Sequence, residues 1–418
     1  MKQNSFSRRD FLKTAGAGSL GAMGLGSFNP ETAKALESLD PIKITKLEAI
    51  TFKDAFWMWV RVYTDQGIVG IGETYFGTNA QIGALKDYSN MIIGKDARNI
   101  ERIWRDLYSR ASFTVTGGAE MRMISAINIA LWDIAGKALG VPVYTLLGGK
   151  AQEKMRVYNT YTNGWNINGM QYDKDAKKIT RFLLDMGVKA AKIYPYEVVG
   201  RKTGGTYISP TDVDDCLKWV KDIREEAGDE MEICIDTMCR WNLPCAVKIA
   251  HSLEPYNIMF IEDMLLPDNA QSYNVLCKET SIAVCHSERL ATRYMFREML
   301  EAKAVDIVMY DMTWCGGPTE AKKISDMADT YYIPTAPHTC GGPVLWHSSI
   351  HTAHTLTNYF IMESSWHFWH DIWPDYVNDL PVPVDGHVVA PEKPGLGVEI
   401  KPEIFKNGLA TIVPIAEI

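Results

Sequence analysis

Residues 232–288 decide the fold, because three apolar runs within this segment each end in an acidic residue. The runs are Glu-Ile-Cys-Ile-Asp (232–236), Ile-Met-Phe-Ile-Glu (258–262) and Ile-Ala-Val-Cys-His-Ser-Glu (282–288). Short apolar runs bounded by polar residues are typical of buried strands. The closing acids Asp236, Glu262 and Glu288 recur at an interval of 26 residues, which fits one strand–helix repeat.

The same alternation extends over residues 154–384. Helix-like segments, such as 212–227 and 318–330, separate eight strand-like runs. The runs span residues 156–160, 190–194, 232–236, 258–262, 282–286, 306–310, 333–336 and 359–363. This pattern predicts a parallel sheet, and eight strands favour a closed TIM barrel. An open doubly wound sheet is the alternative, but the first strand is not followed by the glycine-rich turn of a nucleotide-binding sheet.

Residues 40–153 show a different order, with strands first and helices after them. Residues 42–50 and 57–63 have the apolar pattern of strands. Residues 80–93, 99–110 and 118–139 have the spacing of helices, and the last of these stops at Gly140. We therefore predict a small α+β domain before the barrel.

The first 35 residues are typical of a twin-arginine export signal. Arg8-Arg9 precedes a Gly- and Ala-rich apolar stretch, and Ala33-Lys34-Ala35 has the pattern of a cleavage site. The apolar stretch is too short and too rich in glycine to form a stable membrane span. Residues 1–35 thus predict export to the periplasm, and the alternative is an N-terminus in which the paired arginines occur by chance.

Composition and charge argue against other classes of protein. The chain has 418 residues, 46% of them hydrophobic, and a formal net charge of −8. No basic stripe marks a nucleic-acid surface, and we expect no membrane contact in the mature form. The eight cysteines match no zinc-binding spacing, so we expect most of them to be reduced and buried.

Ionisable residues occupy the strand ends, where TIM barrels carry their functional side chains. These positions hold Tyr161, Lys192, Tyr194, Asp236, Glu262, Glu288, Asp311, His338 and Glu363. The acids Asp236, Glu262 and Glu288 would converge, and they would repel one another unless a cation lies among them. Oxygen ligands favour Mg²⁺. The alternative is that the three acids are unrelated helix caps or surface groups.

This ordered set resembles the enolase superfamily, in particular the branch of mandelate racemase and muconate lactonizing enzyme. The segments that carry the resemblance are 235–236, 260–263, 287–289, 310–311 with 316–317, 336–338 and 361–363. The resemblance implies a modified (β/α)7β barrel over residues 154–384. It also implies an α+β capping domain over residues 40–153, completed by about 385–418. One Mg²⁺ per subunit would be bound by Asp236, Glu262 and Glu288.

The resemblance also implies a catalytic role for four residues. His338 and Asp311 match the family's His-Asp pair, in which the imidazole takes up the proton next to a carboxylate. Lys192 matches a lysine that assists the carboxylate and enolate electrostatically. Glu363 matches a residue that hydrogen-bonds the substrate carboxylate or enolate, and a structural salt bridge is the competing interpretation.

Two departures from the family pattern bear on the reaction: the first disfavours racemisation, and the second means that the acid of a dehydratase would come from another residue, such as His338. Tyr194 stands where a second lysine base is often found, and Met238 stands where some dehydratases carry an acid. A phenol is a poorer base than a lysine near a metal, which leaves His338 as the one good base. We expect Tyr194 to be a catalytic residue that donates a proton to the leaving hydroxyl, or to position the substrate. We expect dehydration of an acid sugar, an aldonate or aldarate, to a 2-keto-3-deoxy acid.

The remaining expectations concern the substrate and the assembly. Candidate substrate contacts are Arg201, Trp241, His286 and Trp366, and each of these has a structural interpretation as well. We expect the chain to form a homo-oligomer and to bind a small sugar acid that carries a carboxylate. The alternative functions are an epimerase, racemase or cycloisomerase with the same enolate chemistry, or an exported binding protein without catalysis.

Overall fold

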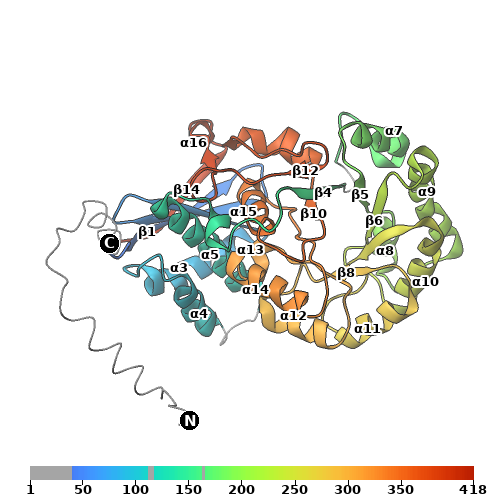
Figure 1. Cartoon of the computed structure of the whole chain (residues 1–418), viewed down its shortest axis with the longest axis horizontal. Helices are drawn as coiled ribbons and strands as arrows, with labels where there is room; N and C mark the ends of the chain where they lie inside the picture. Colours follow the sequence, from blue (N-terminus) through green and yellow to red (C-terminus); the bar gives the residue numbers. More distant parts are fainter. Residues whose placement is uncertain (1–39, 112–116, 162–164) are drawn as a thin grey trace, which may run out of the picture. The chain divides into compact units, whose positions relative to one another are not determined.

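The computed structural model describes residues 40–111, 117–161 and 165–418 (Figure 1). The predicted export signal, residues 1–35, lies outside the described residues. All the elements below belong to the unit Ile42–Ile418. Within the described part of the chain, no helix combines the length and the apolar character that a membrane crossing requires.

A four-stranded antiparallel sheet joins the first and the last described segments of this unit. Its order is β14 (Ala410–Glu417), β1 (Ile44–Phe52), β2 (Trp57–Thr64) and β3 (Val69–Tyr75). In the register of the sheet, Ala49 lies between Val413 of β14 and Val60 of β2. The C-terminal strand is therefore an edge strand of the capping-domain sheet.

The capping domain also contains three helices, α3 (Thr78–Ile92), α4 (Ile100–Ala111) and α5 (Gly118–Leu139). Strand β3 lies unusually close to α5 because it contains two glycines. A Cβ atom on Gly70 would lie 2.2 Å from the carbonyl oxygen of Ala130, and one on Gly72 would lie 1.8 Å from that of Ala126. Only glycine permits this approach of strand to helix.

The barrel strands form one parallel sheet. Its order is β10 (Met362–Ser364), β4 (Met155–Thr160), β5 (Ala190–Ile193), β6 (Glu232–Asp236), β7 (Ile258–Glu262), β8 (Val284–His286) and β9 (Ile307–Val308). β10, the last of these strands along the chain, pairs with β4, the first, as a (β/α)7β barrel requires.

The strand predicted at residues 333–336 is not continuous, which corrects the sequence-based expectation. Single parallel bridges join Thr335 to Val308 on one side and to Tyr359 on the other. Pro334 and Pro337 flank this point and lack the N–H groups that a continuous ladder needs. The barrel therefore closes through isolated bridges between β9 and the segment that precedes β10.

Helices follow the strands around the barrel, and Figure 1 shows α9 to α12 in an arc outside the strands. The barrel helices are α7 (Tyr172–Asp185), α8 (Glu197–Thr203), α9 (Pro210–Ala227), α10 (Leu243–Leu253), α11 (Ala270–Glu279), α12 (Thr292–Glu301), α13 (Met312–Cys315), α14 (Pro318–Asp329) and α15 (Pro343–Ala353). Several begin at a capping side chain: Ser209 forms a capping box with Asp212 before α9, and Asn242 caps α10.

The remaining elements are short, and most of them connect the barrel to the C-terminal strand. They are α6 (Val143–Leu146), 3-10 turns at Glu254–Tyr256 and Trp373–Asp375, a π-helical turn at His367–Ile372, β11 (Val377–Asn378), β12 (His387–Val388), β13 (Glu399–Ile400) and α16 (Glu403–Lys406). Strand β12 pairs antiparallel with β4. The C-terminal segment therefore contacts both the barrel and the capping domain.

Hydrogen bonds from the capping domain hold the starts of two barrel helices, α14 and α15. On α5, Asn128 Oδ1 accepts from the backbone N–H of Thr319 at 3.1 Å. On β3, the buried carboxylate of Glu73 accepts from the N–H groups of Gly342 at 2.6 Å and Val344 at 3.0 Å, at the start of α15. These helices begin shortly after Asp311 and His338, so the cap holds the segments that follow both residues.

Helix α15 buries His347 and His351, and its C-cap residue His354 is buried as well. Burial lowers the pKa of His347 to about 4 and that of His351 to about 3. Nδ1 of His347 bonds the carbonyl oxygen of Pro343 at 2.7 Å, and Nε2 is buried without a hydrogen-bond partner in the described residues. Neutral imidazoles in this helix therefore couple folding to pH.

We expect His347→Leu to make the free energy of unfolding less dependent on pH. Below the ordinary pKa of 6.5 the unfolded chain binds a proton at His347, whereas the folded chain does so only near pH 4. The stability that the neutral form contributes above pH 6.5 is lost as the pH falls through this window, by about 3 kcal/mol. Urea unfolding of both proteins across the window measures this difference, and identical pH slopes would contradict it.

Candidate functional site

Seven buried polar side chains gather at the C-terminal ends of the barrel strands. They come from β5, β6, β7 and β10 and from the segments that follow β8, β9 and the bridge at Thr335. None is more than 6% exposed. The seven are Lys192, Asp236, Glu262, Glu288, Asp311, His338 and Glu363. The topology of the barrel thus brings together residues that are spread over 171 positions of the chain, from 192 to 363.

The ammonium group of Lys192 is shared by three carboxylates. Its Nζ lies 2.7 Å from Glu262 Oε1, 2.9 Å from Glu363 Oε1 and 3.5 Å from Asp236 Oδ2. Burial alone would lower the pKa of Lys192, but the charges of Glu262 and Glu363 raise it well above its ordinary value. Lys192 therefore stays protonated and forms a fixed positive charge.

The predicted metal ligands carry negative charge that their surroundings only partly neutralise. Burial raises the pKa of Asp236 and Glu262, and neighbouring carboxylates raise it further, while Lys192 acts in the opposite direction. Oε2 of Glu262 is buried without a hydrogen-bond partner among the described residues. A set of buried oxygen donors with an unused acceptor suits a hard divalent cation. In this structure, Glu262 faces Lys192 and Glu288 faces His338.

Strained backbone accompanies each of these acids. Met238, Asp263 and Ser287 have φ values of 59°, 46° and 102°, in the region that favours glycine. Such conformations cost about 1–3 kcal/mol each and persist where surrounding contacts hold them. At one of them the N–H of Met238 donates to Asp236 Oδ1 at 2.7 Å. Met238, which occupies the position of the acid predicted from the family pattern, thus orients Asp236 through its backbone N–H group.

His338 and Asp311, the predicted catalytic pair, are in direct contact. Nδ1 of His338 lies 2.8 Å from Asp311 Oδ2, while Nε2 lies 3.0 Å from Glu288 Oε2 and 3.3 Å from Glu363 Oε2. The other oxygen of Asp311 accepts from the N–H and the hydroxyl of Thr313 at 2.7 and 2.5 Å. Burial would lower the pKa of His338, but Glu288, Glu363 and the bond to Asp311 raise it well above its ordinary value.

Tyr75 is a site residue that the sequence did not indicate. It ends β3 of the capping domain, and its hydroxyl donates to Asp311 Oδ2 at 2.6 Å and lies 3.3 Å from His338 Nδ1. Its ring also packs on Trp314, with centroids 4.7 Å apart. The strand-end pattern cannot find it because Tyr75 belongs to the other domain, 236 residues before Asp311.

His286, a candidate substrate contact, uses both ring nitrogens within the protein. Nε2 bonds the carbonyl oxygen of Ala304 at 2.7 Å, and Nδ1 lies 2.8 Å from the hydroxyl of Ser287. The ring stacks on Tyr273 with centroids 3.7 Å apart, and burial lowers its pKa to about 4. These contacts favour a structural role for His286 over a role in substrate binding.

The other candidate contacts are also engaged within the protein. Arg201 lies on α8, and its Nε donates to Glu197 at 3.1 Å. Trp366, 6% exposed, stacks on His370 with centroids 4.0 Å apart. The side chain of Trp241 is 4% exposed. Tyr194, a predicted catalytic residue, places its hydroxyl 3.0 Å from that of Thr160.

Tyr194 lies beside the charged cluster, which the sequence alone does not reveal. The centroid of the Tyr194 ring is 5.7 Å from Lys192 Nζ. Burial raises the pKa of Tyr194 well above its ordinary value, although the charge of Lys192 acts in the opposite direction. The phenol therefore stays protonated and can donate a hydrogen bond, but it cannot act as a base.

Comparison with known proteins agrees with this arrangement. Two sequence profiles match the chain: "Enolase C-terminal domain-like" over residues 174–404, and "Mandelate racemase / muconate lactonizing enzyme, N-terminal domain" over residues 31–148. A D-galactonate dehydratase of Pectobacterium atrosepticum is 34% identical over 373 residues, 87% of this chain and 93% of that protein. A D-xylonate dehydratase of Haloferax volcanii is 30% identical, over 82% of this chain and 83% of that protein.

A solved structure extends the comparison to three dimensions. An enolase of the mandelate racemase subgroup from Agrobacterium tumefaciens superposes with a TM-score of 0.82. It is 35% identical in sequence, and the superposition covers 90% of this chain and 100% of that one. The likeness therefore includes both the capping domain and the barrel.

We expect Lys192→Met to destabilise the metal-free protein by about 3–5 kcal/mol, because buried carboxylates lose their counter-charge. Adding Glu363→Gln should recover part of this loss. Lys393→Met is the matched control, since Lys393 pairs with Asp379 at 2.6 Å on the surface, where such a pair contributes about 0–1 kcal/mol. Urea unfolding in the presence of a chelator measures all three variants. Equal losses at Lys192 and Lys393 would contradict the central role of Lys192.

Proposed function

Because this chain belongs to the enolase superfamily, in the branch of mandelate racemase and muconate lactonizing enzyme, we propose that it is a Mg²⁺-dependent dehydratase of acid sugars. The reaction removes the proton next to the carboxylate and expels the hydroxyl group of the neighbouring carbon as water. The product is a 2-keto-3-deoxy acid. The observation that carries this proposal is the His338–Asp311 pair, 2.8 Å apart, with the imidazole facing Glu288 and Glu363.

Asp236, Glu262 and Glu288 are the residues that would hold Mg²⁺. The unused buried oxygen of Glu262 and the all-oxygen donor set support this choice. When bound, the ion stabilises the negative charge that develops on the substrate carboxylate, which is worth several kcal/mol. A base alone would be too weak for the proton of a carbon next to a carboxylate.

His338 would accept that proton at Nε2. Asp311 fixes Nδ1 as a donor nitrogen, so Nε2, which faces the site, is the atom that would accept the proton once the imidazole is neutral. Asp311 is itself held by Tyr75 and Thr313, so the imidazole has one orientation. The proton taken from carbon can then pass from Nε2 to the departing hydroxyl, and His338 serves as both base and acid.

Lys192 and Glu363 would position and stabilise the anionic intermediate. Lys192 stays protonated and presents a positive charge to the carboxylate and enolate oxygens. Glu363 is held by Lys192 at 2.9 Å and by the N–H of Thr339 at 2.9 Å. The near-complete burial of both groups excludes water, so these interactions act in a medium of low dielectric constant.

Dehydration is favoured over racemisation because the site has one base. Racemisation needs a base on each face of the carbon, and Tyr194, which stays protonated, cannot provide the second one. The relatives named D-galactonate dehydratase and D-xylonate dehydratase support an aldonate as the substrate. We further propose, from Arg8-Arg9 and the stretch that follows, that the enzyme acts in the periplasm.

We expect His338→Asn to lower kcat by about 10²–10⁴-fold, because the proton acceptor is lost. In D₂O, this variant should also fail to exchange the proton next to the carboxylate. Mg²⁺ binding, measured by calorimetry, should be retained. His370→Asn is the matched control, because His370 is largely exposed and pairs with Asp371. Unchanged turnover in the His338 variant would refute its role.

We expect the Mg²⁺-loaded protein to convert an aldonate to a 2-keto-3-deoxy acid, which reaction with semicarbazide detects. The panel would contain D-galactonate, D-xylonate and their epimers. Chelation should abolish turnover and added Mg²⁺ should restore it, because the three carboxylates cannot stabilise an anion by themselves. Deuterium uptake without a keto product would indicate an epimerase, and neither result would indicate a binding protein or an untested substrate.

A further inference from the structure

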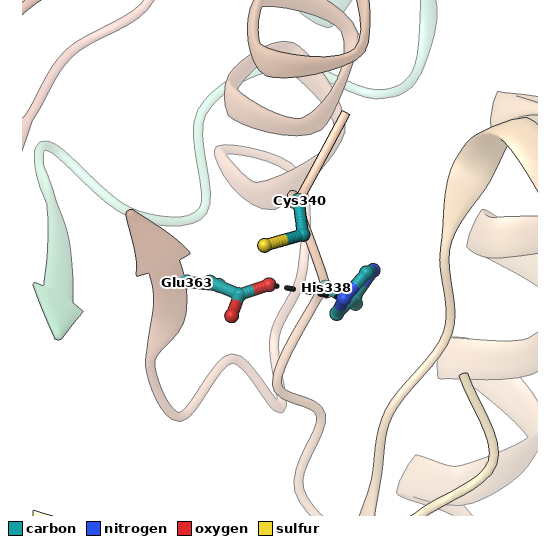
Figure 2. Close-up of side chains that lie close together, drawn as sticks. All are labelled: His338, Cys340 and Glu363. Atoms are coloured by element: carbon teal, nitrogen blue, oxygen red, sulfur yellow. Dashed lines mark ion pairs between the residues drawn. The ribbon is translucent and has the colours of Figure 1, made fainter. Parts of the chain in front are cut away.

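His338, Cys340 and Glu363 form a compact group of three possible metal ligands. One ligand atom from each lies within 4.8 Å of the others, and among the described residues this is the one group of its kind. Figure 2 shows the Cys340 sulfur and the Glu363 carboxylate gathered beside the His338 ring. His338 and Glu363 are buried and Cys340 is half-buried.

The two flanking ligands are already oriented by groups around them. Nδ1 of His338 is tied to Asp311 at 2.8 Å, which leaves Nε2 as the donor atom for a cation. Oε2 of Glu363 accepts from the N–H of Thr339 at 2.9 Å. A carboxylate on the far nitrogen of a histidine is the usual support of a metal-bound imidazole. An ion on Nε2 would replace the contact of Nε2 with Glu288 Oε2 at 3.0 Å, whereas the contacts of Nδ1 and of Glu363 Oε2 stay in place.

The sulfur atom distinguishes this group from the carboxylates of the proposed Mg²⁺ site. Mg²⁺ is a hard cation and prefers oxygen ligands, whereas a thiolate selects softer cations such as Zn²⁺. One thiolate, one imidazole and one carboxylate are ligands that Zn²⁺ accepts, with a water molecule in the fourth position. The surrounding carboxylates of Glu288 and Asp311 add negative charge that attracts a cation.

We propose that His338, Cys340 and Glu363 form a second site, which binds Zn²⁺ and thereby blocks the enzyme. On binding, the S–H bond of Cys340 and the Nε2–H bond of protonated His338 break, the sulfur and the nitrogen bond the metal, and both protons leave to water, with no change in oxidation state. The ion occupies Nε2 of His338, so the imidazole can no longer accept a proton. The inhibition rests on the proposed function, whereas the binding does not.

The binding test uses the Mg²⁺-loaded full chain and Cd²⁺ as a spectroscopic probe for Zn²⁺. We expect a thiolate-to-metal charge-transfer band in the ultraviolet that saturates at one Cd²⁺ per chain. Cys340→Ser should lack the band and should bind Zn²⁺ more than about 100-fold more weakly, because a ligand is lost rather than a supporting group. Circular dichroism checks that the variant is folded.

Cys239→Ser is the matched control. Cys239 is also a buried thiol near a carboxylate, but its sulfur already donates to Asp263 at 2.9 Å and lies 3.2 Å from Arg289 Nε. This variant should keep both the band and the Zn²⁺ affinity. Loss of the band in Cys239→Ser, with the band retained in Cys340→Ser, would overturn the assignment.

The inhibition test measures turnover with Mg²⁺ in excess and Zn²⁺ added. We expect inhibition of the wild-type enzyme and its loss in Cys340→Ser. Equal inhibition of the two proteins without a charge-transfer band would mean that Zn²⁺ replaces Mg²⁺ at the carboxylates, and it would overturn the proposal. The band does not depend on turnover, so failure of the dehydratase assignment and failure of the Zn²⁺ site are separate outcomes.

Discussion

The site depends on one constraint: several carboxylates are buried together with a single ammonium group. Lys192 holds Glu262 at 2.7 Å and Glu363 at 2.9 Å, and it is itself fully buried. Removing such charges from water is costly unless they are paired, so the positions of these side chains are fixed by one another. The remaining negative charge would attract a cation, and the proposed Mg²⁺ site at this end of the barrel depends on it.

The imidazole of His338 lies at the border between this charged cluster and the capping domain. One ring nitrogen faces Glu288 and Glu363, and the other is held by Asp311. Asp311 in turn accepts a hydrogen bond from Tyr75 of the cap. The two domains therefore orient the proposed base jointly, because the cap supplies a hydrogen bond to Asp311 that the barrel alone lacks.

One strand position of the barrel, next to the capping domain, is irregular. The segment at Thr335 makes single bridges to Val308 and Tyr359 instead of a ladder, and prolines flank it. The cap then fixes the start of α15 through Glu73, whose carboxylate accepts two backbone N–H groups there. Hydrogen bonds from the other domain thus hold His338 where regular strand pairing does not.

The sequence alone determined the barrel, the order of its strands and the residues at their ends. Apolar runs that close on Asp236, Glu262 and Glu363 specify buried strands with a charge at the rim, and parallel connections bring those rims together. Periodicity is a local property, so it can be read without the fold. The family resemblance added the pairing of His338 with Asp311, which spacing does not reveal.

Only the tertiary structure decided which partner each charge has. Tyr75 reaches Asp311 from another domain, Cys340 comes to lie beside His338 and Glu363, and His286 turns to the backbone of Ala304 instead of a ligand. The strand predicted at 333–336 is interrupted at its prolines, whose effect the prediction from the apolar pattern did not take into account. The reason is physical: periodicity reports which face of an element is buried, whereas hydrogen-bond partners depend on distances between segments that are remote in the chain.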